Sequence, residues 1–356
     1  MKILHSADIH LDSAFVGRSV DAVAALRRAQ LRLPGLLAEL CRRQNCDMML
    51  LSGDVFDGNW TKDSVDALRK ALADVAVPVF ISPGNHDFCD MDSPWIRESW
   101  PENVHIFKEN AIQSVALPNL DCRVYGAAFT SMDCSALLEG FQKEGEETYH
   151  IAVLHGDPAQ KKSPYNPITQ AQVASSGLDY IALGHVHKAG SFRAGQTLCA
   201  WPGCPMGRGF DELEEKGVYL VEVGEHVQAE FVLLDTPRFY DLEAEILTDP
   251  VSAVAAVLPA VGNDHHYRIT FTGEWDGLDL PQLQAQFTQF PNLELRDRTV
   301  PVTDLWACAG EDSLEGTYFG MLKTALDGAS EEEQQILTLA AKLSRRILDG
   351  REVVLP

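Results

Sequence analysis

The sequence predicts an α/β fold in which parallel strands alternate with covering helices. Short apolar runs at residues 2–6, 47–52 and 77–81 are bounded by turn signals, which is typical of buried strands. Between them, residues 20–46 and 61–75 carry apolar side chains at helical spacing. The resulting β-α-β-α-β order implies parallel pairing, with the helices packed against the sheet.

Shorter strands with tight turns are predicted from residue 104 onward. Runs at 104–107, 111–115 and 122–126 favour strands, and residues 150–189 favour another β-α-β section. Residues 195–223 indicate further strands around a loop rich in glycine and proline. We expect these segments to form a second sheet that packs on the first.

Three residues mark the predicted helix boundaries. Thr61 and Ser330 each precede a helical pattern and are suitable N-caps, and Ser330 is followed by three glutamates. Pro34 is expected to interrupt the first helix, because proline lacks the backbone N–H that a helix interior needs.

The last third of the chain has its own alternating pattern, beginning near residue 237. The expected elements are strands at 239–247, 266–273 and 293–300, helices at 250–261 and 281–290, and a helical tail at 312–348. We therefore expect a large domain at 1–237, a small β-α-β-α-β domain at 238–301 and a tail at 302–356, since 356 residues exceed one ordinary core.

Composition limits the classes of protein to which the chain can belong. Its 29 basic and 52 acidic residues give a net charge of -23, which argues against a simple basic groove for nucleic acid. The eight cysteines form no C-x-x-C pair, so they predict reduced thiols. No apolar run is long enough for a membrane span, and we expect a cytoplasmic protein without membrane contact.

Polar residues follow five of the predicted strands, and Asp54 lies at the centre of this pattern. In open α/β sheets, ligands bind at the carboxyl ends of strands. Carboxylate and imidazole groups together suit Mn, Fe or Zn, and seven candidates are too many for one ion but fit two. The candidate ligands are Asp8, His10, Asp54, Asn85, His155, His185 and His187.

Each of these short patterns alone has a simpler interpretation. A single Asp-x-His at a strand end is more often incidental, and Asn85 with its neighbours fits an Asx turn. Their joint occurrence in order, each at the end of an apolar run, favours the metal site.

The pattern resembles the calcineurin-like metallophosphoesterases. The matching motifs are Asp8-Ile9-His10, Gly53-Asp54-Val55-Phe56-Asp57, Gly84-Asn85-His86-Asp87, His155-Gly156 and Gly184-His185-Val186-His187. The SbcD-like nucleases, a DNA-repair exonuclease branch, are similar in residues 7–13, 179–188 and 202–208. The resemblance implies a four-layer α-β-β-α sandwich as the catalytic domain, with a small capping domain and a helical C-terminal tail.

The resemblance also implies roles for individual residues. Asp8, His10 and His187 would hold one metal, Asn85, His155 and His185 the other, and Asp54 would bridge the two divalent ions, most often Mn2+. His86 would act on the scissile phosphate as metal-bound hydroxide attacks, and either Asp87 or Asp57 would orient it.

Substrate and partners are implied less directly. DNA would be the substrate, and Arg208 and Lys162, next to Lys161, are the candidate phosphate contacts, with Arg193 as a further basic residue. The apolar stripe of the last helix either packs on the chain's own core or docks an SbcC-type coiled-coil ATPase; a homodimer is a further expectation. The alternatives are a phosphodiesterase or phosphatase for a small molecule or phosphoprotein, and a non-enzymatic scaffold.

Overall fold

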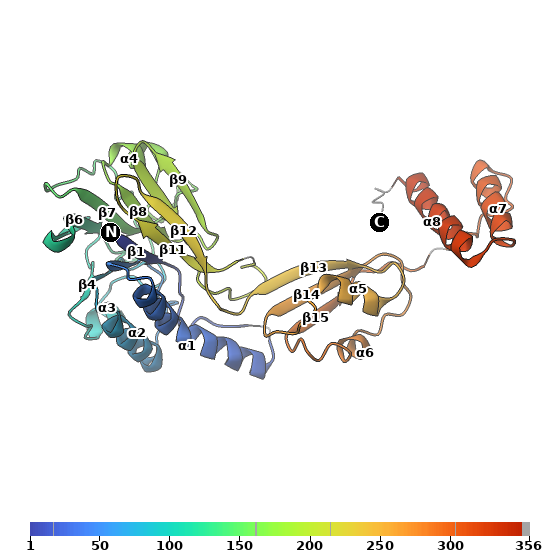
Figure 1. The fold of residues 1–356 in the computed structure, drawn as a ribbon, viewed down its shortest axis with the longest axis horizontal. Coiled ribbons are helices and arrows are strands. Elements are labelled where there is room, and N and C mark those ends of the chain that lie inside the picture. Colours follow the sequence, from blue (N-terminus) through green and yellow to red (C-terminus); the bar gives the residue numbers. More distant parts are fainter. Residues whose placement is uncertain (17, 161, 214, 303, 351–356) are drawn as a thin grey trace. The chain divides into compact units, whose positions relative to one another are not determined.

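The computed structural model describes residues 1–16, 18–160, 162–213, 215–302 and 304–350 (Figure 1). The chain divides into two compact units. The first consists of Met1–Leu242, Val261–Ile269 and Phe287–Glu294, and the second consists of Glu243–Ala260, Thr270–Gln286 and Leu295–Pro356.

The first six-stranded sheet has the order β12-β11-β1-β2-β3-β4. Its strands β1 to β4 are parallel, whereas β11 pairs with β1 and β12 with β11 in antiparallel fashion. The strands are β1 (Lys2–Ser6), β2 (Met48–Leu51), β3 (Val79–Ile81), β4 (Val104–Ile106), β11 (Gly217–Glu222) and β12 (Gln228–Leu233).

The second six-stranded sheet has the order β5-β6-β7-β8-β10-β9. Here β6, β7, β8 and β10 are parallel, and the outer strands β5 and β9 are antiparallel to their neighbours. The strands are β5 (Gln113–Leu117), β6 (Cys122–Gly126), β7 (Tyr149–His155), β8 (Tyr180–Gly184), β9 (Gly190–Ala194) and β10 (Thr197–Trp201).

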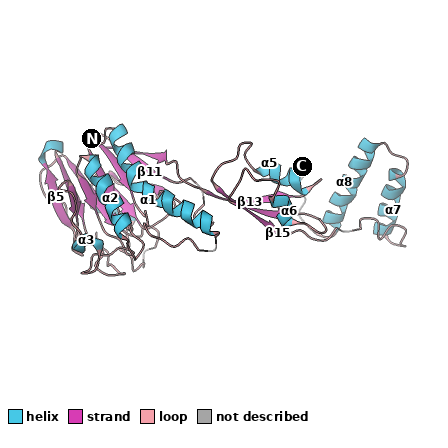
Figure 2. Cartoon of the chain, turned by 90° about the horizontal axis from the view of Figure 1, so that it is seen from below, coloured by secondary structure: helices cyan, strands magenta, loops and turns pink. Residues whose placement is uncertain are grey.

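Helices cover the outer faces of both sheets, which gives four layers (Figures 1 and 2). Helices α1 (Val20–Arg43), α2 (Lys62–Val75) and α3 (Pro94–Arg97) lie on the first sheet, and α4 (Gln170–Ser175) lies on the second. Successive residues of a strand face opposite sides. Accordingly, Leu4 packs in the core beneath α1 and α2, and Ile3 packs between the sheets. Leu154 of β7 packs with Val173 of α4. The predicted α-β-β-α sandwich is confirmed.

Three details of the sequence prediction are wrong. Strands β4 and β11 belong to the first sheet, where they extend it beyond β3 and β1, and not to the second. Helix α1 continues through Pro34. Proline in a helix interior costs about 3 kcal/mol, but Leu26, Leu33 and Leu37 on the same helix are buried, and their packing offsets that cost.

The remaining elements follow the predicted β-α-β-α-β order and end in two helices. A third sheet has the order β13-β14-β15. Helix α5 is shorter than predicted because Leu258, which precedes Pro259, is extended with ψ 150. The elements are β13 (Phe239–Glu245), α5 (Pro250–Val257), β14 (His266–Thr272), α6 (Leu280–Gln284), β15 (Leu293–Asp297), α7 (Leu314–Leu326) and α8 (Glu331–Leu348); η1 (Pro118–Leu120) is a single 3-10 turn in the second sheet.

The predicted caps at Thr61 and Ser330 are both present. The Thr61 hydroxyl accepts from the Ser64 backbone N–H, and Glu333 accepts from the Ser330 backbone N–H at 2.8 Å. Within the described part of the chain, no helix combines the length and the apolar character that crossing a membrane requires.

The contact between the two large sheets generates the first prediction. A Cβ added at Gly126 of β6 would collide with the ring of Phe107, which is fully buried between the sheets. We expect Gly126→Ala to lower the free energy of unfolding by about 1–3 kcal/mol, the usual effect of overpacking.

Gly35 of α1 is the control, because no atom lies within 4 Å of a Cβ added there. Gly35→Ala should therefore be neutral or stabilising by up to about 1 kcal/mol in the same urea titration. Equal effects of the two substitutions would contradict the packing described.

Candidate metal centre

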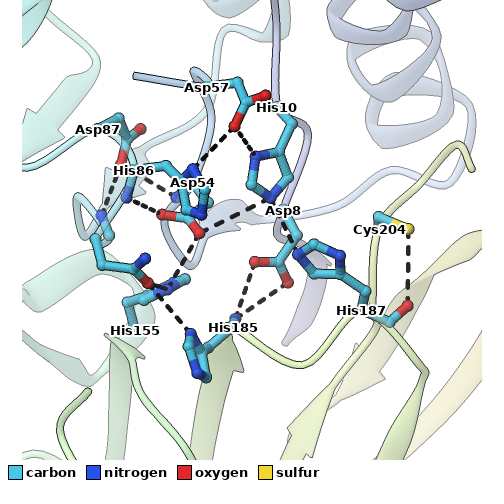
Figure 3. Close-up of polar contacts among 12 residues, drawn as sticks. Asp8, His10, Asp54, Asp57, His86, Asp87, His155, His185, His187 and Cys204 are labelled. Atoms are coloured by element: carbon cyan, nitrogen blue, oxygen red, sulfur yellow. Dashed lines mark hydrogen bonds and ion pairs between the residues drawn. The ribbon is translucent and has the colours of Figure 1, made fainter. Parts of the chain in front are cut away.

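The carboxyl ends of β1, β2, β3, β7 and β8 deliver the candidate residues to one place (Figure 3). The loops after β1 and β2 are joined by backbone hydrogen bonds. Asp8 N–H donates to the Gly53 carbonyl at 3.0 Å, and His10 N–H donates to the Asp54 carbonyl at 2.9 Å. These bonds fix Asp8 and His10 relative to Asp54.

The backbone at these residues is not extended. Strand β1 ends at Ser6, and Asp8, His10 and Asp54 have φ of 50, 49 and 49 degrees, in the left-handed region. His185 has φ 96. Such conformations cost on the order of 1–3 kcal/mol each and persist where the surrounding structure imposes them, often at functional sites.

Two glycines allow the close approach of the loops. A Cβ at Gly84 would collide with Asp54 Oδ1 and with the backbone nitrogen of Asp54, and a Cβ at Gly53 would collide with the His155 ring. Gly53 also has φ 86, which disfavours any side chain. The site can therefore be this compact only with glycine at both positions.

The first ligand group consists of Asp8, His10 and His187, whose donor atoms all lie within 4.8 Å of one another. His10 Nε2 lies 3.1 Å from His187 Nε2. The other nitrogen of each ring faces a carboxylate: His10 Nδ1 lies 3.0 Å from Asp57 and His187 Nδ1 lies 2.7 Å from Glu212. An ionised carboxylate only accepts, so both Nδ1 atoms donate and both Nε2 atoms present lone pairs.

Two facing lone pairs at 3.1 Å require a proton or a cation between them. Burial acts to lower the pKa of His187, but the hydrogen bond to Glu212 and the charge of Asp8 raise it overall. Histidine that ligates a metal usually donates its second N–H to a carboxylate in this way. The donor set therefore fits a cation.

The second ligand group surrounds the amide oxygen of Asn85. His155 Nε2 lies 2.9 Å from Asn85 Oδ1 and 3.4 Å from Asp54 Oδ2, and His185 Nδ1 lies 3.2 Å from Asn85 Oδ1. His155 Nδ1 donates to the Ser52 carbonyl at 2.9 Å, which leaves its Nε2 lone pair facing oxygen atoms. Burial lowers the pKa of both His155 and His185, so neutral imidazoles are favoured. A second cation fits this group.

Asp54 lies between the two groups. Its Oδ2 lies 3.8 Å from His10 Nε2 on one side and 3.4 Å from His155 Nε2 on the other. Its Oδ1 accepts from the His86 backbone N–H at 2.9 Å. The Asp54 side chain is 2% exposed, so its charge has almost no solvent to screen it. Asp54 therefore adjoins both groups and is placed to share its charge between them.

The carboxylate that pairs with the His86 side chain is that of Asp57. His86 Nδ1 lies 2.9 Å from Asp57 Oδ1, and this hydrogen bond raises the pKa of His86. Burial acts to raise the pKa of Asp57, but the hydrogen bonds from His10 and His86 hold it well below its usual range. The His86 side chain is 44% exposed, whereas that of His10 is fully buried.

Asp87 organises the backbone of the site. Its carboxylate accepts from the N–H groups of Gly84 at 2.7 Å, Val55 at 2.8 Å and Asp54 at 3.1 Å. Burial and the charge of Asp54 raise the pKa of Asp87 to about 7, and the N–H groups of Gly84 and Val55 act against the rise. Asp57, not Asp87, is thus the carboxylate in contact with His86, a choice that the sequence left open.

The basic residues that the sequence suggested as phosphate contacts differ in their surroundings. Arg208 lies at the site: Nε and Nη2 donate to Glu212, at 3.0 and 2.5 Å, and Nη1 lies 3.7 Å from Asp57 Oδ2. Lys162 is exposed, and Lys161 lies outside the described residues. Arg193 donates to the backbone carbonyl of Gln196 in its own hairpin at 3.1 Å and to that of Val227, which precedes β12 of the first sheet, at 2.6 Å.

Sequence reasoning missed Glu212. This carboxylate is buried, and it contacts both His187 and Arg208. Its only signal in the sequence is an acid four residues after Arg208, in a loop without a periodic pattern. Such spacing alone does not distinguish a site residue from a surface acid.

Comparison with known proteins agrees with this geometry. The calcineurin-like phosphoesterase family matches residues 1–189, more than half of the 356. The chain is 30% identical over 236 residues to the uncharacterised metallophosphoesterase YhaO of Bacillus subtilis, over 63% of this chain and 57% of that protein. It thus spans little more than half of that relative's length.

Two further similarities are weaker. The SbcD component of the nuclease SbcCD of Bacillus subtilis is 25% identical over 282 residues, which cover 67% of this chain and 71% of that protein. A dimetal phosphatase from Danio rerio is 14% identical, with a TM-score of 0.42, over 64% of this chain and 95% of that one. The family match spans β1 to the loop after β8 and contains both ligand groups and His86. The chain therefore belongs to the calcineurin-like phosphoesterase family.

Proposed function

We propose that this protein is a dinuclear-metal-dependent phosphodiesterase that hydrolyses DNA, an exonuclease subunit in DNA repair. The observation that carries the proposal is the pair of adjacent ligand groups that share Asp54, with the His86 side chain beside them and paired with Asp57. Two-metal sites of this composition stabilise both the attacking and the leaving oxygen of a phosphoryl displacement.

The proposed division of ligands follows the two groups. Asp8, His10 and His187 would hold one ion, Asn85, His155 and His185 the other, and Asp54 would contact both. Mixed carboxylate, amide and imidazole ligands suit Mn2+, with Fe or Zn as alternatives. When bound, the two ions would supply a deprotonated water near neutral pH and offset charge on the phosphoryl oxygens.

His86 is proposed to act on the phosphate. Its Nδ1 is held by Asp57 at 2.9 Å, so the ring is oriented and its Nε2 is left for the substrate. The raised pKa of His86 favours the protonated ring, which can donate to an oxygen that gains charge. Of the three Arg208 guanidinium nitrogens, Nη1 has the fewest contacts with Glu212, and it is our candidate phosphate contact. The exposed Lys162 is a second candidate.

DNA as the substrate is supported by two observations. One is the similarity to a nuclease component. The other is the solvent face of α1, which carries five arginines in a chain with a net charge of -23. Arg27, Arg28 and Arg32 are exposed and have no ion pair or hydrogen bond among the described residues. The opposite face of α1 carries Gln30, which donates to the His10 carbonyl at 2.6 Å. Arginines along one helix face are typical of backbone contact with nucleic acid.

A partner is proposed for the C-terminal helices. Helices α7 and α8 pack together through Phe319 and Ala341, both fully buried. Ile336 and Ile347 of α8 are 62% and 63% exposed. An SbcC-type coiled-coil ATPase is our proposed occupant of this face, and a second copy of the chain is the alternative. We also propose a cytoplasmic location, supported by eight free thiols.

The first test concerns the metals and His86. The purified chain should bind two divalent ions and lose activity with a chelator. Because His86 is proposed to touch the phosphate and not the ions, His86→Ala should keep both ions and lose about 10²–10⁴-fold in rate. Metal analysis and turnover of a small phosphodiester measure the two effects. Loss of an ion along with activity would show that His86 is a ligand.

The second test concerns the substrate. We expect Mn2+-dependent cleavage of DNA ends and a binding constant that falls with salt, because released counterions drive such binding. Replacing Arg27, Arg28 and Arg32 with Gln should reduce the magnitude of the log–log salt slope by about 0.9 per lost phosphate contact. The exposed residues Lys70, Lys108 and Lys143, changed to Gln together, are the control with equal charge loss.

Both triple variants should cleave a small phosphodiester at the unmodified rate, since none of these residues is at the metal centre. If the unmodified protein cleaves small phosphodiesters or phosphoproteins but no DNA, the DNA proposal is wrong. If it cleaves DNA and both triple variants have the same salt slope, α1 is not the binding face.

The third test concerns the C-terminal helices. Ile336→Glu with Ile347→Glu changes only exposed positions, so the chain should stay folded and active on short DNA. Binding to a purified SbcC-type ATPase, measured by calorimetry, should be lost. Light scattering of the chain alone separates the two occupants, since a shift from dimer to monomer in the double variant would identify self-association.

A further inference from the structure

We propose that Glu212 is a positioning residue for the first ligand group and that Arg208 holds the Glu212 carboxylate in place. This inference rests on the proposed metal centre and adds to it a residue that neither the motifs nor the similarity to relatives assigns. Glu212 lies in the loop between β10 and β11, 25 residues after His187 in the sequence.

The contacts of Glu212 are complete and directed. Its Oε1 accepts from His187 Nδ1 at 2.7 Å and from Arg208 Nη2 at 2.5 Å, and its Oε2 accepts from the Arg208 backbone N–H at 2.8 Å. The side chain is 6% exposed. A buried carboxylate is stable only when paired and hydrogen-bonded in this way, so its geometry is well fixed. That geometry sets the direction of His187 Nε2 toward His10 Nε2.

Arg208 links Glu212 to the partner of the other histidine. Its Nη1 lies 3.7 Å from Asp57 Oδ2, and Asp57 Oδ1 lies 3.0 Å from His10 Nδ1. One guanidinium therefore stands between the two carboxylates that orient His187 and His10. Because the guanidinium is planar and rigid, it holds both imidazole rings with their Nε2 atoms directed at the same point. Asp8 completes that group.

A separate metal site at Glu212 is the competing interpretation. Donor atoms of His187, Cys204 and Glu212 do lie within 4.8 Å of one another. However, both Glu212 oxygens accept from Arg208, and Cys204 Sγ lies 3.7 Å from the His187 carbonyl, to which it can donate. A carboxylate that already holds a guanidinium with both oxygens is a poor metal ligand. Glu212 therefore acts through His187.

The experiment is stepwise titration of the metal-free chain with Mn2+, followed by calorimetry and by electron paramagnetic resonance. Glu212→Ala should weaken one of the two Mn2+ sites by about 10–100-fold, the usual effect of losing an outer-shell partner, and should leave the other unchanged. The signal from coupled Mn2+ pairs should then appear only at higher metal concentration. Glu212→Gln, whose amide oxygen can still accept from His187 Nδ1, should weaken the site less.

Glu215→Ala is the matched control, because Glu215 is an exposed acid three residues further along the same loop. It should bind both ions like the unmodified chain. Equal weakening of both sites in Glu212→Ala, together with a lower melting temperature of the metal-free protein, would make Glu212 a purely structural residue. Unchanged affinities would also overturn the inference. If the unmodified chain binds only one ion, the two-metal proposal fails, and the inference about Glu212 is then decided by whether Glu212→Ala weakens that ion.

Discussion

The structure of the first unit depends on one electrostatic constraint. Buried imidazole nitrogens and a buried carboxylate direct their lone pairs at one another, and no hydrogen-bond donor lies between them. His10 Nε2 and His187 Nε2 face each other at 3.1 Å, and Asp54 Oδ2 lies 3.4 Å from His155 Nε2. In water these groups would separate. Here the outer nitrogens are held by Asp57, Glu212 and the Ser52 carbonyl, so the rings cannot turn away. A proton or a cation at the centre resolves this arrangement, and the donor set fits a cation.

The two sheets supply the rigidity that this constraint needs. Asp8, His10, Asp54 and His185 all adopt backbone conformations that non-glycine residues avoid. These residues follow directly on parallel strands that are buried on both faces, and the loops after β1 and β2 are joined by backbone hydrogen bonds. Asp87 adds further restraint, because one carboxylate collects N–H groups from the loops after β2 and β3. The stability of the layers thus maintains local strain at the centre.

The sequence was sufficient for the layered fold and for the residues that meet at the centre. Parallel β-α-β units place strand ends at one edge, so a polar residue after each strand has few other places to go. It was insufficient where tertiary packing decides. Strand β4 pairs with β3 and strand β11 with β1 in the first sheet, and nothing in a short apolar run specifies which sheet it joins. Pro34 lies within a continuous helix because the helix is held by its buried face.

At the site itself, Glu212 is a residue that the sequence alone did not predict. The candidate metal ligands named from the sequence are those that follow strand ends, where the chain direction fixes their position. Glu212 reaches the centre from an irregular loop, and its role depends on a guanidinium that contacts two carboxylates from distant segments. A chain with a net charge of -23 has many acids, and only their contacts distinguish this one. Ligands can thus be read from motifs, whereas the residues that orient the ligands follow from three-dimensional contacts. The charge balance at the centre requires both: Arg208 offsets part of the negative charge that Asp57 and Glu212 bring close to the cation sites, so these carboxylates can orient histidines without themselves needing a metal.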